Sequence, residues 1–138
     1  MKYTFPIKEK MVCASSTFSI SYLNAEKVCK VLNRKKFTDA KNLLEKIVNE
    51  EVSIKGKYYT KTSKEILKLL NQLENNAKAR EIASDNMILF ISAHKGAKIQ
   101  RSRRSSKFGT RLKQSHVKAV LSEEYGFGKK VRERGNKK

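Results

Sequence analysis

The fold is decided by residues 87–121, which read MILFISAHKGAKIQRSRRSSKFGTRLKQSHVKAVL. They begin with a nearly continuous apolar run, Met87 to Ala93, which predicts a central strand covered on both faces. They end with an alternating run, Ser115 to Leu121, whose odd-numbered side chains face one way, and this predicts an antiparallel partner strand. The polar segment between the two runs is therefore the far part of a long extended hairpin, at about residues 99–113.

The hairpin is strongly basic and carries no acid. Between residues 95 and 120 the basic residues are Lys95, Lys98, Arg101, Arg103, Arg104, Lys107, Arg111, Lys113 and Lys118. Like charges at this density repel one another, and so polar a ribbon is marginal in water. We expect it to order against an anionic partner. The alternative, a solvated face, would usually mix in carboxylates.

The composition of the whole chain agrees with a polyanion partner. Its 138 residues hold 32 Lys+Arg against 13 Asp+Glu, a net charge of +19, and 38% hydrophobic residues, enough for one modest core. The longest apolar run, Met87 to Ile91, is far below the roughly 18 residues that span a bilayer, so we expect no membrane insertion. Cys13, Cys29 and the sparse histidines lack the ligand spacing of a four-ligand zinc site. We therefore expect no metal and no cofactor. The two cysteines fit a reduced cytosolic setting, although counting leaves a single disulfide open.

The rest of the chain predicts an α+β fold with three helices packed on a small antiparallel three-stranded sheet. Residues 1–16 predict an irregular or partly extended arm, and Thr17–Ile20 a short strand. Helices are expected at about 21–33, 38–48 and 62–80, capped by Ser21, by Thr38 and by a Thr62-x-x-Glu65 capping box. Their apolar stripes are Ala25, Val28, Cys29 and Leu32; Ala40, Leu43, Leu44, Ile47 and Val48; and Ile66, Leu70, Leu73 and Ala77, widened by Leu67 and Leu69. Cys29 is thus interpreted as a core residue.

Two other functions are compatible with parts of this sequence: an enzyme that cleaves RNA and an architectural protein that binds DNA. His94 and His116 flank the hairpin on neighbouring strands and could serve as acid and base in a ribonuclease, but no positioned carboxylate accompanies them. A basic β-arm could also belong to an architectural DNA-binding protein, although such arms insert an apolar or Pro wedge and this arm is almost wholly polar.

The order of these parts resembles the universal large-subunit ribosomal protein family numbered twenty-two, in its archaeal/eukaryotic branch. The matching stretches are Ser19–Ala25, Gly56–Tyr59, Lys64–Leu70, Glu74–Ala77, Ile91–Gly96, Phe108-Gly109 and Ser115–Val117. The resemblance covers about residues 17–122. Three departures stand out. Tyr22, Leu23 and Asn24 stand where family members commonly have Pro and basic residues. The connection between the second and third helices is short, and so is the stretch from Gly109 to His116.

The resemblance implies a non-catalytic protein of the cytoplasmic large ribosomal subunit. Its partners would be large-subunit ribosomal RNA, neighbouring ribosomal proteins and the nascent peptide in the exit tunnel, with no homo-oligomer. It would support subunit assembly, bind RNA through its globular domain and hairpin, and help to line the tunnel. The chain would form a single domain over residues 1–138, with a globular part at about 17–98 plus 114–122, the hairpin at 99–113 and a basic tail at 125–138.

Backbone recognition is the predicted mechanism, because Arg presents a planar fork to phosphate and Lys a point charge. The residues predicted to bind RNA are Lys95, Lys98, Arg101, Arg103, Arg104, Lys107, Arg111, Lys113, Lys118, Lys129, Lys130, Arg132 and Arg134. The tip predicted to reach the tunnel is Arg103, Arg104, Ser105, Ser106, Lys107, Phe108 and Gly109. Tyr3, Tyr22, Tyr58, Tyr59 and Tyr125 could stack on unpaired bases, with core packing open for Tyr58 and Tyr59. Arg34, Lys35 and Lys36 form a second basic cluster, which could equally complement a helix dipole.

Overall fold

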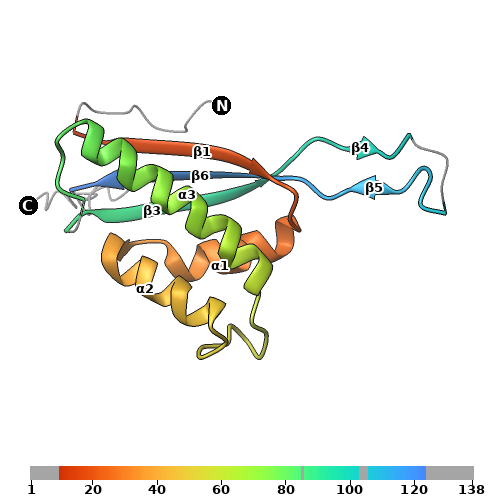
Figure 1. Ribbon diagram of the computed structural model, residues 1–138, viewed down its shortest axis with the longest axis horizontal. Helices are drawn as coiled ribbons and strands as arrows, with labels where there is room; N and C mark the ends of the chain where they lie inside the picture. The colour runs from red at the N-terminus through yellow and green to blue at the C-terminus, as the bar shows by residue number, and fades with distance from the viewer. Residues whose placement is uncertain (1–9, 85, 103–105, 124–138) are drawn as a thin grey trace, which may run out of the picture.

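The computed structural model describes residues 10–84, 86–102 and 106–123. Its elements are β1 (Val12–Phe18), α1 (Tyr22–Leu32), β2 (Lys35–Lys36), α2 (Phe37–Val48), α3 (Thr60–Ala79), β3 (Ile88–Lys95), β4 (Ile99–Gln100), β5 (Arg111–Leu112) and β6 (Ser115–Ser122). Four strands form an antiparallel sheet in the order β1-β6-β3-β2, and β4 and β5 form a second, two-stranded sheet. The second sheet lies on a ribbon that extends away from the body (Figure 1).

The pairing of β3 with β6 is the longest in the sheet. It runs without a break from Ile88 opposite Ser122 to Lys95 opposite Ser115, which confirms the two strands predicted from residues 87–121. β6 lies between β3 and β1 and is paired on both edges. Its backbone groups are therefore satisfied on both sides, as buried backbone requires.

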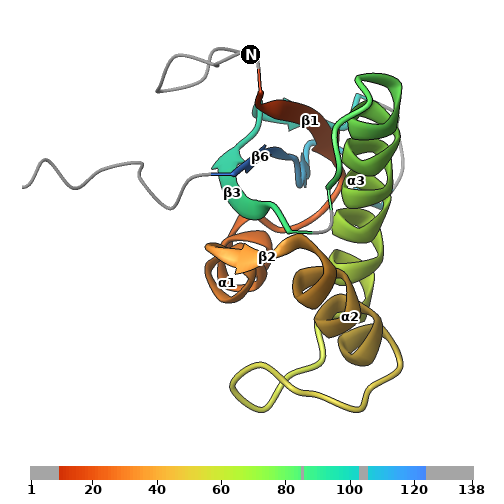
Figure 2. The same cartoon turned by 90° about the vertical axis from the view of Figure 1, so that its left-hand side faces the viewer.

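One face of the sheet carries the core. Its buried side chains are Val12 and Ala14 from β1, Leu89 and Ile91 from β3, and Val117, Ala119 and Leu121 from β6. Helix α3 packs across β1 and β6, α1 packs against β3, and α2 packs against α3 (Figures 1 and 2). The alternate side chains of the strands thus pack against the apolar stripes of the helices in one core layer.

The sheet departs from the prediction in two places. It has four strands rather than three, because Arg34 turns the chain with a positive φ of 65° and its N–H donates to the Leu89 carbonyl at 2.8 Å. This turn brings β2, from the predicted basic cluster, against β3. In addition, β1 begins at Val12 and not at Thr17, so the predicted arm over residues 1–16 is wrong in its last part. Small Ala and Ser side chains weaken the alternation that would have indicated the longer strand.

The helix starts were predicted less well than the helix faces. Ser21 stands at the N-cap of α1, but its side chain makes no capping hydrogen bond. Helix α2 begins at Phe37, directly after β2, so Thr38 is not its cap. Helix α3 begins at Thr60, which places Thr62 inside the helix, where it is buried, and the predicted capping box is wrong.

The predicted apolar stripes are confirmed in their main members. Ala25, Val28, Cys29 and Leu32 are buried on α1, Ala40, Leu44 and Ile47 on α2, and Ile66, Leu69, Leu70, Leu73 and Ala77 on α3. Leu43 and Leu67 are partly buried against the same core. Both cysteines are free thiols, and burial raises the pKa of Cys29 to about 12, which fits a packing role.

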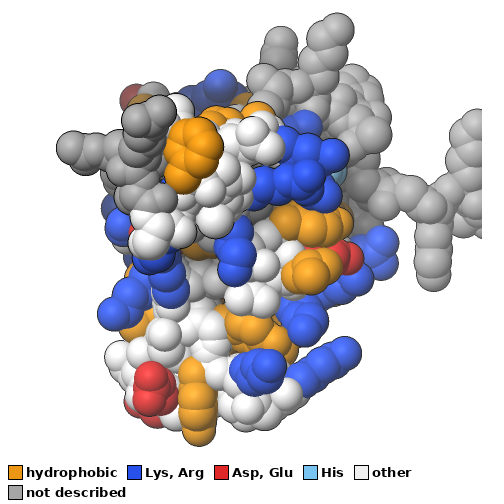
Figure 3. All heavy atoms as spheres, turned by 90° about the vertical axis from the view of Figure 1, so that its right-hand side faces the viewer, with side chains coloured by type: hydrophobic (Ala, Val, Ile, Leu, Met, Phe, Trp, Pro, Cys, Tyr) orange, Lys and Arg blue, Asp and Glu red, His pale blue; other side chains and the backbone are white. Residues whose placement is uncertain are grey.

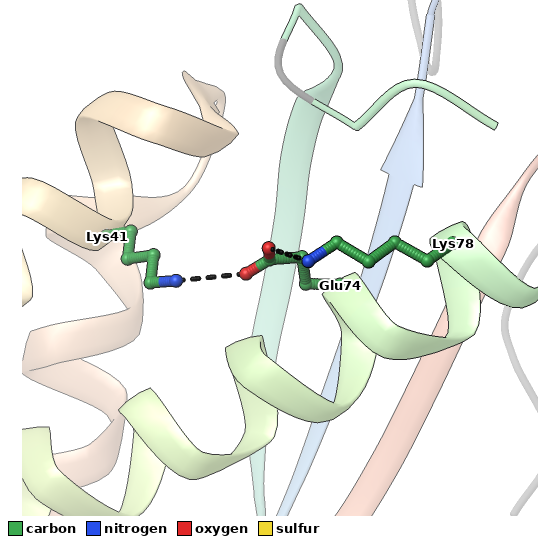
Figure 4. A network of polar contacts seen from close by, with 3 residues as sticks. All are labelled: Lys41, Glu74 and Lys78. Carbon is green, nitrogen blue, oxygen red and sulfur yellow. Dashed lines mark hydrogen bonds and ion pairs between the residues drawn. The ribbon is translucent and has the colours of Figure 1, made fainter.

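Helices α2 and α3 are joined by a small ionic network (Figure 4). Glu74 on α3 accepts from Lys78 at 2.8 Å, one turn along the same helix, and from Lys41 of α2 at 2.9 Å. The hydrogen bonds from Lys78 and Lys41 lower the pKa of Glu74 from its ordinary 4.5 to about 2. Because the folded-state pKa is depressed, this carboxylate stabilises the fold above pH 4.5, and its contribution is lost as the pH falls toward 2.

We predict that Glu74→Gln lowers the free energy of unfolding at pH 7 by about 1 kcal/mol, the upper range for partly exposed ion pairs. The difference from the wild type should shrink as the pH falls from about 4.5 to 2, measured by denaturant unfolding at each pH. Glu65→Gln is the matched control, since the ion pair of Glu65 is with Lys68 of its own helix and does not join two helices. A difference for Glu74→Gln that stays constant down to pH 2 would contradict the assignment.

Candidate nucleic-acid interface

The basic ribbon continues the β3–β6 pairing beyond the body. Successive contacts along it are Lys95 opposite Ser115, the Gly96 N–H donating to the Gln114 carbonyl at 3.0 Å, Ile99 opposite Leu112, Gln100 opposite Arg111, and the Arg101 N–H donating to the Thr110 carbonyl at 3.0 Å. The ribbon therefore leaves the sheet in a direction that the buried strands set (Figure 1).

Gly96 stands where the ribbon leaves the sheet. A Cβ atom at this position would lie 2.8 Å from the Gln114 Cβ and 2.9 Å from both the carbonyl carbon and the carbonyl oxygen of Gln114. Such distances do not occur between packed atoms, and two of the three neighbours are backbone. The two arms can approach this closely only because position 96 has no side chain.

A local turn at Gly109 begins the returning arm of the ribbon. Its φ of +72° is in the left-handed region, and its N–H donates to the Arg101 carbonyl at 3.1 Å. The Thr110 N–H and its hydroxyl both donate to the Lys107 carbonyl, at 3.2 and 2.6 Å, and so close the turn. Phe108 lies on this turn with 61% of its surface exposed. The turn at Phe108-Gly109 matches the place expected from the resemblance.

The structure gathers six of the predicted RNA-binding cations on the ribbon. Lys95, Lys98, Arg101, Lys107, Arg111 and Lys113 are all exposed there. Figure 3 looks onto this end of the molecule and shows Lys and Arg side chains around hydrophobic ones. Lys118 lies apart from them, half-buried within β6 and opposite Ser15 and Ser92. Arg103, Arg104, Ser105, Lys129, Lys130, Arg132 and Arg134 lie outside the described residues.

A groove of about 420 Å³ opens at the root of the ribbon, between the first turn of α1 and both ribbon arms. Its apolar lining comes from Tyr22, Leu23, Ala97 and Leu112. Its basic lining comes from Lys95, Lys98, Arg111 and Lys113, and no lining residue is acidic. Leu23 is 63% exposed and therefore lies at the surface of α1.

The two histidines face each other across β3 and β6, as predicted. The His116 Nδ1 lies 2.6 Å from the Thr17 hydroxyl, and the His94 Nε2 lies 3.1 Å from the Ser92 hydroxyl. Neither imidazole has a carboxylate partner among the described residues. This is an arrangement of hydroxyl-bonded histidines, without the third group that orients a catalytic base. Within the described ranges there is also no group of three metal-ligating side chains.

The aromatic side chains divide between body and surface. Tyr59 is partly buried against the core, and the Lys27 ammonium lies 5.9 Å from its ring centroid, so packing explains it. Tyr58 is 44% exposed, and Tyr22 lines the groove. Tyr3 and Tyr125 lie outside the described residues. Among the helices that the structure describes, none is long and apolar enough to cross a bilayer.

Comparison with known proteins agrees with this arrangement. The family model for ribosomal protein L22p/L17e matches residues 13–122. The chain belongs to this family. It is 28% identical to the large ribosomal subunit protein uL22 of Sulfurisphaera tokodaii, over 70% of this chain and 78% of that protein. It is 37% identical to the uL22 of Sulfolobus acidocaldarius over 49% and 46% of the two chains, and 28% identical to that of Archaeoglobus fulgidus over 59% and 66%.

Membership of the L22p/L17e family decides between the classes of function. The family consists of structural, non-enzymatic proteins of the cytoplasmic large ribosomal subunit, so the chain is such a protein and not a ribonuclease. The similar proteins named here are archaeal, which agrees with the branch inferred from the sequence.

Two features of this interface were missed in the sequence. Gly96 stands within a stretch that matches the family, but nothing in the sequence indicates that a neighbouring strand passes so close to it. The groove joins residues 22–23 to residues 95–114, a juxtaposition that only the fold creates. One signal was available: Leu23 interrupts the polar face of α1 and is not on the predicted apolar stripe.

We predict that Gly96→Ala forces the two arms apart at the ribbon root while leaving the body folded. Hydrogen exchange should be at least tenfold faster at the amides of position 96 and Arg101, and unchanged in α3. Gly56→Ala is the control, because its φ of +74° makes the change costly in backbone strain, yet no atom lies within 4 Å of where its Cβ would be. Unaltered protection at both ribbon amides in Gly96→Ala would show that the close approach is not a constraint.

Proposed function

We propose that the chain binds large-subunit ribosomal RNA through its basic ribbon and its globular body, supports subunit assembly, and helps to line the nascent-peptide tunnel. The single observation that carries the proposal is the ribbon itself. Among its described residues the ribbon presents six exposed cations, and the sequence has no acidic residue between positions 95 and 122.

Phosphate recognition follows from the geometry of the arms. Lys98 and Arg101 lie on the outgoing arm, and Arg111 and Lys113 lie on the returning arm. Neighbouring arms of a β-ribbon are about 4.8 Å apart, so the cations of both arms lie close to one narrow axis. An A-form RNA helix is recognised mainly through backbone and shape, and a narrow cationic ribbon can contact phosphates of more than one RNA segment.

The tunnel role extends the same feature to its far end. A local turn over Lys107 to Thr110 lies in the far part of the ribbon and exposes Phe108. A thin arm can pass between RNA helices to an interior surface that the body cannot reach. We place the nascent peptide among the partners on this basis, and we propose that the chain joins the subunit as one domain without a second copy of itself.

Neutralising the arms provides the test. Arg101→Gln, Lys107→Gln, Arg111→Gln and Lys113→Gln together remove four candidate phosphate contacts, so the slope of log affinity against log salt should fall by roughly 0.7 to 0.9 per lost contact. The measurement is a filter-binding titration on deproteinised archaeal large-subunit RNA at several salt concentrations.

The matched control removes the same charge from exposed lysines of the body, at Lys46, Lys55, Lys57 and Lys64. It should leave the slope closer to the wild-type value than the ribbon variant does. If the salt slope fell equally in the two variants, the ribbon would contribute only to the general positive charge of the protein. Equal affinity for duplex DNA of the same length would contradict specific recognition of RNA by the ribbon.

A further inference from the structure

The groove at the ribbon root is lined by apolar side chains that are not part of the core and by basic side chains. Leu23 from α1 and Leu112 from β5 are 63% and 38% exposed. Leu112 pairs across the ribbon with Ile99, which does not line the groove. A volume of about 420 Å³ is within the range of about 300 to 1,000 Å³ that is usual for small-ligand sites.

The charges around this apolar floor define the occupant. Four cations line the groove, at Lys95, Lys98, Arg111 and Lys113, and no carboxylate does. A ligand that matches this lining therefore pairs an apolar part with negative charge. Ser21 and Gln114 also line the groove, and their hydroxyl and amide groups can donate to or accept from polar edges.

A single unstacked nucleotide has this composition. Its base offers apolar faces and a polar edge, and its flanking phosphates offer the negative charge. A base within a duplex is stacked on both faces and cannot enter, whereas a splayed base from a loop or bulge can. An uncharged peptide segment would cover Leu23 and Leu112 but would leave the four cations unmatched.

We propose that this groove binds one unpaired nucleotide of the RNA, with its base against Tyr22, Leu23 and Leu112 and its phosphates against the four surrounding cations. The inference rests on the proposed RNA binding and adds a base-accepting site to it. It also assigns a role to Tyr22 and Leu23, which follow Ser21 at the start of α1 and line the groove. The chain binds here by apolar contact, and the charge comes from the ribbon.

The test compares two double variants of the full chain. Leu23→Ala with Leu112→Ala removes the apolar floor of the groove. Val31→Ala with Ile99→Ala is the matched control, because Val31 is an exposed apolar residue on the same helix, and Ile99 belongs to the same ribbon rung without lining the groove. Both are titrated against deproteinised archaeal large-subunit RNA, and the wild-type complex is irradiated so that crosslinked peptides can be identified.

The groove variant should bind about tenfold more weakly, at the lower end of what a stacked base contributes, and the control within about twofold of the wild type. The salt slope should not change, because no charge is removed. Crosslinks should join a nucleotide to the peptides that contain Tyr22 or Leu112.

The opposing results are distinct. Wild-type affinity in the groove variant would overturn the nucleotide site while leaving RNA binding by the ribbon in place. Equal weakening of both variants would assign the effect to the ribbon rung and would also overturn it. In native subunits, a crosslink from the groove to a neighbouring protein would show that a peptide occupies the groove, and it would overturn the nucleotide site. Absence of RNA binding by the wild type would remove the proposed function and this site with it.

Discussion

The backbone pairing between β3 and β6 is the constraint on which the rest of the molecule depends. Within the body it is fixed by buried side chains on both strands, Ile91 opposite Ala119 and Leu89 opposite Leu121. Beyond the body the same pairing continues through Gly96 and Gln114 into a ribbon with few apolar side chains. An isolated ribbon of that kind is marginal in water. The core therefore supplies the register and direction that the ribbon cannot supply for itself.

Charge is distributed differently in the body and in the ribbon. Several body carboxylates are matched by nearby lysines, as in Glu26 with Lys30, Glu65 with Lys68, and Glu74 with Lys41 and Lys78. The ribbon has cations and no carboxylate of its own. Its self-repulsion is relieved only when an external anion arrives, so binding and ordering of the ribbon are favoured by the same interaction.

Much of the fold was predictable because it depends on periodicity. The strands at Ile88–Lys95 and Ser115–Ser122 and the faces of the three helices follow from apolar spacing alone. The two-residue strand β2 has no periodic signal, since Lys35 and Lys36 pair with β3 only through the backbone turn at Arg34. The capping box failed because Tyr59 and Thr60 start α3 earlier than the Thr62-x-x-Glu65 spacing indicated. The charges of the candidate site were predictable, but its shape was not. Its shape depends on the close approach of Gln114 to Gly96 and on the groove, and both arise from contacts between segments that are distant in the sequence.

The most direct test of the central claim is a structure of native large subunits that contain this chain, determined by electron cryo-microscopy after a high-salt wash. We predict that the chain is retained, with the β3–β6 pairing continuous into the ribbon and with Arg101 and Arg111 within hydrogen-bond distance of RNA phosphates. A ribbon that faces solvent without RNA contacts, or a chain that the salt wash removes, would contradict it.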